Sequence, residues 1–414
     1  MMAQLMGTKH PNINFNVLFY PQYTNEYGQV ICHPGSVFEG IVQIKVAVAM
    51  PVHHIKLVFK ASERVNYDAM GWEKSKSTDD RLFAVRTVLW GLPSGIDIPQ
   101  DAWPILDAGE HTFPFVCQMP VINYPPTFHH HLIATAFNMV VSVNKAGESL
   151  PILSKLIPIC FQPIIETIPI KNLQAFTESH RLITHITTLV SVPRLAYNIN
   201  DSNQSVPVTV HFNSERSSDE HFPVSQLRVY IKRYYCINYK TFSRNEATII
   251  AHSDYPKLPA ACPCTVSMKL DLPNQEELPA TLSYSPHLTI HYKLVVSVKI
   301  RHGPIHVKKK LFDMPIIFGT LPAGTRAPRQ LESYSDIVEN RASLNNKPHF
   351  LRPQPRNQND EEFLPAYDGD GVPPAYLSVH RLEDNLNDGH ATSVTRMNTA
   401  DSTPANSLRL EMTR

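Results

Sequence analysis

Glycine is scarce in this chain of 414 residues, with 15 copies, whereas proline occurs 35 times. Each proline inside a helix removes a backbone hydrogen-bond donor and clashes with the preceding turn. Long helices are therefore disfavoured over most of the chain. The composition instead favours many short strands joined by loops that contain proline.

Long apolar runs are also missing. None reaches the roughly 18 residues that a membrane-spanning helix requires, and the first residues lack the basic and apolar regions of a signal peptide. The six cysteines are too thinly spread for the dense disulfide framework of a small secreted domain. We therefore expect a cytoplasmic protein whose cysteines are mostly small buried side chains.

No charge of one sign dominates, since 38 Lys and Arg residues face 37 Asp and Glu residues. A chain this close to neutral has no overall field that attracts nucleic acid or an anionic membrane. We expect no nucleic-acid partner, and any electrostatic contact must come from a local patch.

The motifs of common enzymes are absent as well. The sequence has no nucleophile elbow, phosphate-binding loop, H-E-x-x-H pattern or dinucleotide-binding glycine pattern. The clusters His129–His131 and Cys262/Cys264 lack a partner pair at the spacing of a closed zinc site. We expect neither a metal nor a cofactor. A β-sandwich hydrolase or ligand-binding enzyme remains as an alternative, but it has no visible catalytic constellation.

What the chain does have is period-two alternation of apolar and polar side chains, the pattern of half-buried strands. It places Phe38, Val42, Ile44, Val46 and Val48 on one face of a strand. The clearest case is residues 288–300, where Leu288, Ile290, Tyr292, Leu294, Val296, Val298 and Ile300 alternate with polar residues. A turn at 302–304 and a returning strand predict a long antiparallel hairpin there.

Helical patterns are weak, and the best candidate, Ala175–Arg181, is short. After Gly319 the alternation stops, and the remaining sequence is polar, with few aliphatic side chains. The sequence thus predicts an all-β protein of two sandwich domains in tandem, followed by a disordered tail. The expected boundaries are an N-terminal extension at 1–11, domains at 12–168 and 169–322, and the tail at 323–414.

Three segments resemble the arrestin fold, and specifically the α-arrestin branch of trafficking adaptors in its fungal type. They are 34–40 with the strand that follows, 106–120 with its Gly-Glu-His turn and Phe-Pro-Phe strand, and 288–300 with 314–319. The resemblance spans about residues 12–320. It implies two arrestin-like sandwiches that bind the cytosolic tails of plasma-membrane transporters or receptors, without catalysis.

The tail carries two related short motifs. Consecutive prolines preset a polyproline II helix that lies across an aromatic groove, and the tyrosine fills an adjacent slot, so both motifs predict binding to WW domains. The residues concerned are Leu364, Pro365 and Tyr367 of an LPxY motif, and Pro373, Pro374 and Tyr376 of a PPxY motif.

The resemblance implies what these motifs recruit. In α-arrestins the partner is a HECT-type ubiquitin ligase with WW domains, which promotes ubiquitin-dependent endocytosis and sorting of the bound cargo. The protein would then be cytoplasmic, associate with membranes peripherally through its cargo, and be recruited to the plasma membrane and endosomes. The alternative within the family is a pH-signalling scaffold that links a membrane receptor to the multivesicular-body machinery.

A run of lysines on the returning strand of the hairpin is the one candidate basic patch. Lys308, Lys309 and Lys310, with Lys299 and Arg301 on the preceding strand, would suit an acidic cargo tail or a phosphoinositide headgroup. A solvated strand face is the simpler interpretation, because charge runs usually only keep a face wet.

Overall fold

The computed structural model describes the part of the chain that carries the strand patterns. The described residues are 10–25, 28–69, 79–93, 98–167, 174–201, 204–215, 224–255, 263–274, 277–302, 304–340 and 346–351. Among them, no helix is long and apolar enough to cross a membrane.

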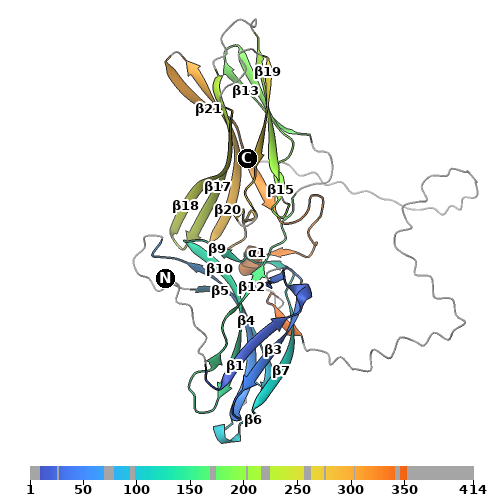
Figure 1. Ribbon diagram of the computed structural model, residues 1–414. Helices are drawn as coiled ribbons and strands as arrows, with labels where there is room; N and C mark the ends of the chain where they lie inside the picture. Colours follow the sequence, from blue (N-terminus) through green and yellow to red (C-terminus); the bar gives the residue numbers. More distant parts are fainter. Residues whose placement is uncertain are drawn as a thin grey trace, which may run out of the picture. The chain divides into compact units, whose positions relative to one another are not determined.

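The N-terminal half forms two sheets that enclose one core (Figure 1). The first sheet has the order β1 (Ile13–Phe19), β3 (Val37–Val46), β7 (Gly109–Gln118) and β23 (His349–Leu351). The second has the order β2 (Val30–Cys32), β12 (Ile157–Phe161), β10 (Ile133–Lys145), β4 (Met50–Val65) and β5 (Asp79–Gly91). Short strands add to it, namely β6 (Ile105–Leu106), β9 (Phe128–His129) and β11 (Ile152–Leu153). Two 3-10 turns, Pro21–Tyr23 and Gln100–Ala102, lie in the connections.

The second half repeats this two-sheet arrangement. One sheet has the order β13 (Phe176–Ile183), β14 (Ile186–Val192), β16 (Ser205–Ser214) and β19 (Cys264–Asp271). The other has the order β15 (Ala196–Asn198), β21 (Ile305–Gly319), β20 (Leu288–His302), β17 (Val224–Tyr239) and β18 (Phe242–Tyr255). The prediction of an all-β fold built from sandwiches is confirmed.

Alternation determines which side chains enter each core, because successive residues of a strand point to opposite faces. All seven apolar residues of the 288–300 pattern are buried in β20, and β20 pairs with β21 as the predicted antiparallel hairpin. In β3, Phe38, Val42, Ile44 and Val46 are buried as predicted, but the placement of Val48 was wrong. The strand ends at Val46, so Val48 lies beyond the alternation and is exposed.

Ala175–Arg181, the best of the weak helical candidates, is not a helix. Residues Phe176–Ile183 form the edge strand β13. Each residue from Phe176 to Arg181 is paired with β14 in antiparallel register, so tertiary pairing overrides the weak local preference.

The segment after Gly319 differs most from expectation. We predicted a disordered tail from residue 323, yet residues 326–340 and 346–351, which we call the strap, fold back onto the N-terminal sandwich. The strap contains β22 (Glu332–Ser333), which pairs with β8 (Ile122–Asn123), the helix α1 (Tyr334–Asn340), and β23, which pairs with β7.

Apolar anchors explain why this polar segment folds. Tyr334 is buried, and Ile337 and Phe350 pack against the N-terminal core. Three large side chains at suitable spacing are enough to dock a segment onto an existing core, although they produce no strand pattern.

Two glycines lie in the segment 34–40, which resembles the arrestin fold, and each has a structural reason. Gly35 adopts a φ of 74°, a left-handed conformation that favours glycine at a turn. At Gly40 in β3, a Cβ atom would lie 2.5 Å from the backbone oxygen of Leu18 and 2.7 Å from the ring of Phe115. Glycine is therefore required there for close packing.

Candidate functional site

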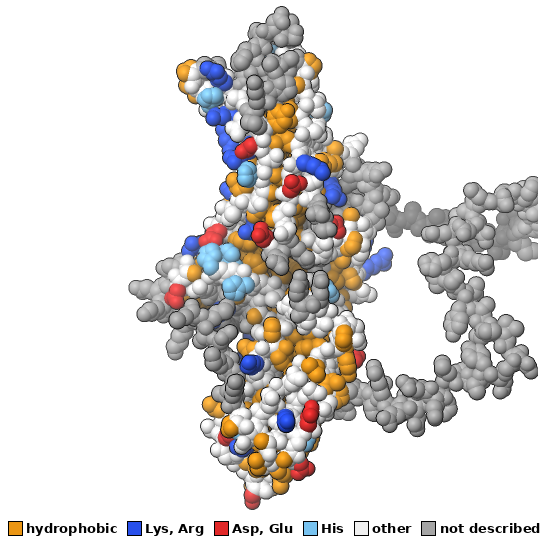
Figure 2. Space-filling model, in the orientation of Figure 1, with side chains coloured by type: hydrophobic (Ala, Val, Ile, Leu, Met, Phe, Trp, Pro, Cys, Tyr) orange, Lys and Arg blue, Asp and Glu red, His pale blue; other side chains and the backbone are white. Residues whose placement is uncertain are grey.

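The basic patch predicted from sequence lies on the β20–β21 hairpin. Lys299 is directly opposite Lys308, and Arg301 is directly opposite His306. Directly opposed residues of an antiparallel pair share a face. These four side chains therefore lie on one face of the hairpin, and Figure 2 shows Lys and Arg side chains gathered along this edge of the C-terminal sandwich.

The other two predicted residues, Lys309 and Lys310, each form a contact of their own and do not add free charge to this face. Lys309 is opposite the buried Val298, so it projects to the other face, where its Nζ donates a hydrogen bond to the backbone oxygen of Arg181. Lys310 Nζ lies 2.7 Å from Asp313 Oδ2. The hydrogen bond to Asp313 and the charge of that carboxylate raise the pKa of Lys310.

A groove of about 240 Å³ opens on the face that carries Lys299 and Lys308. Its lining consists of Gln226, Arg228, Ser297, Val298, Lys299, His306 and Lys308. Arg228 is neutralised by Asp254 at 3.0 Å. Within the described part of the chain, Lys299 and Lys308 form no ion pair, although Lys308 Nζ lies 5.4 Å above the ring of Tyr230.

Like charges directly opposite each other destabilise a pair of strands. The repulsion between Lys299 and Lys308 is relieved if an anion binds between them. The groove therefore has the size and charge to hold a carboxylate or phosphate group.

A larger groove, about 800 Å³, runs beside β1. It lies between β1 and residues 153–157, and it includes Lys45 and Lys155. Among the described strands, β1 pairs only with β3, so its other edge has backbone groups available for pairing. An extended peptide can add to such an edge as a further strand.

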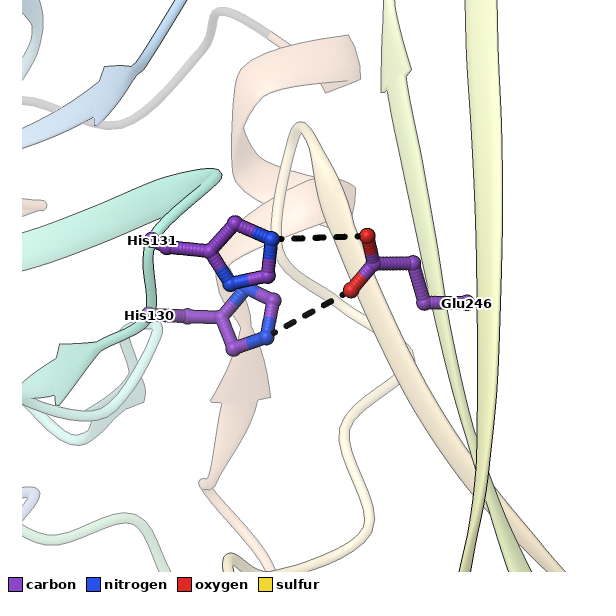
Figure 3. A group of neighbouring side chains, drawn as sticks. All are labelled: His130, His131 and Glu246. Carbon is purple, nitrogen blue, oxygen red and sulfur yellow. Dashed lines mark ion pairs between the residues drawn. The ribbon is translucent and has the colours of Figure 1, made fainter. Parts of the chain in front are cut away.

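A third cluster joins the two sandwiches (Figure 3). His130 and His131, in the turn before β10, each direct Nε2 toward one oxygen of Glu246 on β18, at 3.7 Å and 3.4 Å. Sequence reasoning noticed the histidines but missed Glu246, because residues so far apart in the chain give no shared spacing signal.

The chemistry of this cluster favours hydrogen bonding over metal binding. The backbone N–H of Leu132 donates to His130 Nδ1 at 3.4 Å, which leaves the ring proton on Nε2, facing Glu246. A metal would need the lone pair of that Nε2. Arg244 also lies 3.1 Å from the same Glu246 oxygen as His131, and it donates to the backbone oxygen of Ala69. Burial is the main cause that lowers the pKa of His130, and the neighbouring His131 adds to it.

The predicted tail residues, namely Leu364, Pro365, Tyr367, Pro373, Pro374 and Tyr376, lie outside the described residues. The last described residue, Leu351, is held in β23 on the N-terminal sandwich.

Comparison with known protein families gives a match over one region of the chain. Residues 186–323 match the family model of the arrestin (or S-antigen) C-terminal domain. No curated protein matches the chain significantly. The matched region begins at β14 and includes β20, β21 and the basic groove. Residues 186–323 are therefore similar to the C-terminal domain of arrestins, and this similarity supports the resemblance to the arrestin family and favours an adaptor or scaffold role.

Proposed function

We propose that this protein is a non-enzymatic adaptor of the α-arrestin type, which binds membrane-protein cargo through its sandwiches and recruits a WW-domain HECT ubiquitin ligase through its tail. The observation that carries the proposal is the combination of an arrestin C-terminal domain at 186–323 with the LPxY and PPxY motifs at 364–376. Ubiquitin-dependent endocytosis and sorting of the cargo would follow.

The tail supplies the ligase-binding half of this function. Two related motifs lie within 13 residues (364–376), in a polar stretch with few aliphatic side chains to bury them. Polyproline motifs bind WW grooves at low entropic cost because their conformation is largely preset.

The sandwiches supply the cargo-binding half. The groove around Lys299 and Lys308 suits an acidic cytosolic segment of a transporter or receptor, because binding there relieves the lysine repulsion. The free edge of β1 offers a second contact for an extended segment. Such binding would bring a cytoplasmic protein to the plasma membrane and endosomes.

Binding of the full chain to a purified multi-WW fragment of a HECT ligase tests the ligase-binding half. Tyr376→Ala should weaken binding at least tenfold, and the double variant Tyr367→Ala/Tyr376→Ala should abolish it. Ser378→Ala, just outside the PPxY motif, is the matched control and should bind like the wild type. Equal binding by all four proteins would refute ligase recruitment through these motifs.

The same experiment separates the alternative from the main proposal. A pH-signalling scaffold would keep its principal interaction after loss of Tyr376. The main proposal requires that the interaction depends on this tyrosine.

A further inference from the structure

A buried carboxyl group lies where the two sandwiches meet. Glu63 on β4 is 1% exposed. Its Oε2 accepts hydrogen bonds from Thr135 Oγ1 of the N-terminal sandwich at 3.1 Å and from Ser285 Oγ of the C-terminal sandwich at 2.8 Å. Its Oε1 has no hydrogen-bond partner among the described residues. An ionised carboxylate that is buried and only partly hydrogen-bonded is costly, so this position favours the protonated acid.

His287 lies beside this carboxyl group and contacts the N-terminal sandwich directly. Its Nε2 is 2.7 Å from Asp80 Oδ2 on β5, and its Nδ1 is 3.2 Å from the backbone oxygen of Asn238. A carboxylate and a carbonyl oxygen only accept hydrogen bonds, whereas a neutral imidazole carries a single N–H. Both contacts are satisfied together only when the ring is doubly protonated.

The strap covers the same place. Tyr334 at the start of α1 donates from its hydroxyl to the backbone oxygen of Leu82 at 3.4 Å, and its ring lies 5.3 Å from that of Tyr124. Burial raises the pKa of Tyr334 to about 12, and the charges of Glu63 and Asp80 add to the shift. The strap, Glu63 and Asp80 are therefore neighbours.

Among the described residues, Tyr239 on β17 also faces His287, and its ring centroid lies 5.0 Å from the imidazole. On Tyr239, the Nζ atom of Lys240 lies 5.3 Å from the ring centroid. Among the described residues, the charged groups with a stated place near His287 are Glu63, Asp80 and Lys240.

We propose that Glu63, Asp80 and His287 form a proton-dependent latch, which holds the 285–288 loop and the strap on the N-terminal sandwich and loosens as pH rises. With the latch closed, Glu63 favours its acid form, while His287 joins the 285–288 loop to Asp80, so the closed state holds one more proton than the open state. A rise in pH then shifts the equilibrium toward the open state.

The direction in which the pKa of Glu63 is shifted agrees with a latch that loosens as pH rises. Burial raises the pKa of Glu63, and the Ser285 hydroxyl, the His287 charge and the Thr135 hydroxyl partly oppose it. A raised pKa means that the stabilisation is present at low pH and is lost as pH rises. Glu63 therefore loses its proton at a pH above the ordinary range of a glutamic acid. The pKa of His130 is lowered instead, mainly by burial, so this residue does not account for a loss of protection as pH rises.

Opening the latch changes the reach of the tail. With the strap docked, the 12 residues 352–363 separate β23 from Leu364 and span at most about 40 Å. With the strap released from residue 326 onward, the chain before Leu364 spans at most about 130 Å. This consequence for the ligase-binding motifs rests on the proposed function, whereas the latch itself does not.

Hydrogen exchange of the full chain at pH 6 and pH 8, corrected for the intrinsic pH dependence of exchange, tests the latch. We expect the corrected exchange of residues 286–288 and 332–340 to be about tenfold or more faster at pH 8, because one linked proton allows up to tenfold per pH unit. Glu63→Gln mimics the protonated acid and should stay protected at both pH values. His287→Gln replaces the imidazole that contacts Asp80 and should exchange faster than the wild type already at pH 6.

His180→Gln is the matched control, because His180 pairs with Glu178 within β13, away from the junction. It should keep the wild-type response. A variant that fails to fold is recognised by loss of protection throughout β20, and the other variant then decides. Equal protection of the wild type at both pH values would overturn the proposal, as would a full wild-type response in Glu63→Gln or wild-type protection of His287→Gln at pH 6.

Discussion

The hydroxyl of Tyr124 donates a hydrogen bond to the backbone oxygen of Asn346, a residue 222 positions later in the chain. Tyr124 is fully buried in the N-terminal core, next to Phe83, Phe161 and Tyr334. The start of β23 is thereby tied to the centre of the N-terminal sandwich. The region that matches the arrestin C-terminal domain model, residues 186–323, is thus followed by a strap that returns to the first sandwich.

Tyr124→Phe removes this hydrogen bond and keeps the ring. We expect a loss of about 1 kcal/mol in the free energy of unfolding, because the oxygen of Asn346 loses its donor. Exchange protection of residues 349–351 should fall as well. Urea denaturation and hydrogen exchange measure both effects. Tyr255→Phe, at an exposed tyrosine on β18, should change neither.

Gly40→Ala should destabilise the N-terminal sandwich by about 1–3 kcal/mol, because the added methyl group meets the backbone oxygen of Leu18 and the ring of Phe115. Glu39→Ala on the same strand adds no such contact and serves as the control. If the urea midpoint of Gly40→Ala equals that of the control, the close packing of β1, β3 and β7 described above is incorrect.

The double variant Lys299→Gln/Lys308→Gln should weaken the binding of an acidic peptide without lowering the stability of the fold. Removing two directly opposed positive charges relieves repulsion, so stability should be unchanged or slightly higher. Binding of an acidic peptide should weaken at least tenfold and lose its dependence on salt. Fluorescence titration at low and high salt measures this. Lys240→Gln/Lys269→Gln removes the same charge from exposed positions elsewhere and should bind like the wild type.

Because the pKa of His54 on β4 is lowered, we expect the protein to lose stability in acid. Burial and then the charges of Lys56, His53 and Arg86 lower its pKa to about 4. A lowered pKa means that the stabilising contribution is present above the ordinary histidine pKa and is lost as pH falls toward 4.

Thermal unfolding at pH 7 and pH 5 checks this effect. The melting temperature of His54→Gln should fall less between these values than that of the wild type. His252→Gln, an exposed histidine on β18, should behave like the wild type. An identical acid response in all three proteins would contradict the shift.

The alternation of apolar and polar side chains allowed most strands of the two sandwiches to be predicted from the sequence. In β20, seven apolar residues repeat at period two, and each is buried, because the strand lies between neighbours on both sides. Shorter signals were less informative. Phe176–Ile183 is an edge strand whose exposed residues hide the period, and α1 depends on contacts with a distant core rather than on its own seven residues.

The candidate sites were only partly predictable for the same reason. Lys299 and Lys308 are visible because a hairpin brings nearby residues together in a fixed register. The contacts of Glu246 with His130, and of His287 with Asp80, depend on how two separate sandwiches meet. No local pattern encodes such contacts.

Co-flotation of the ligase with vesicles tests the adaptor account most directly. The vesicles carry a lipid-anchored peptide rich in Asp and Glu, and the full chain is mixed with a HECT ligase fragment that contains its WW domains. We predict that the wild type brings the ligase to the vesicles, that Tyr367→Ala/Tyr376→Ala binds the vesicles without the ligase, and that Lys299→Gln/Lys308→Gln binds neither. Equal recovery of the ligase with all three proteins would contradict the account.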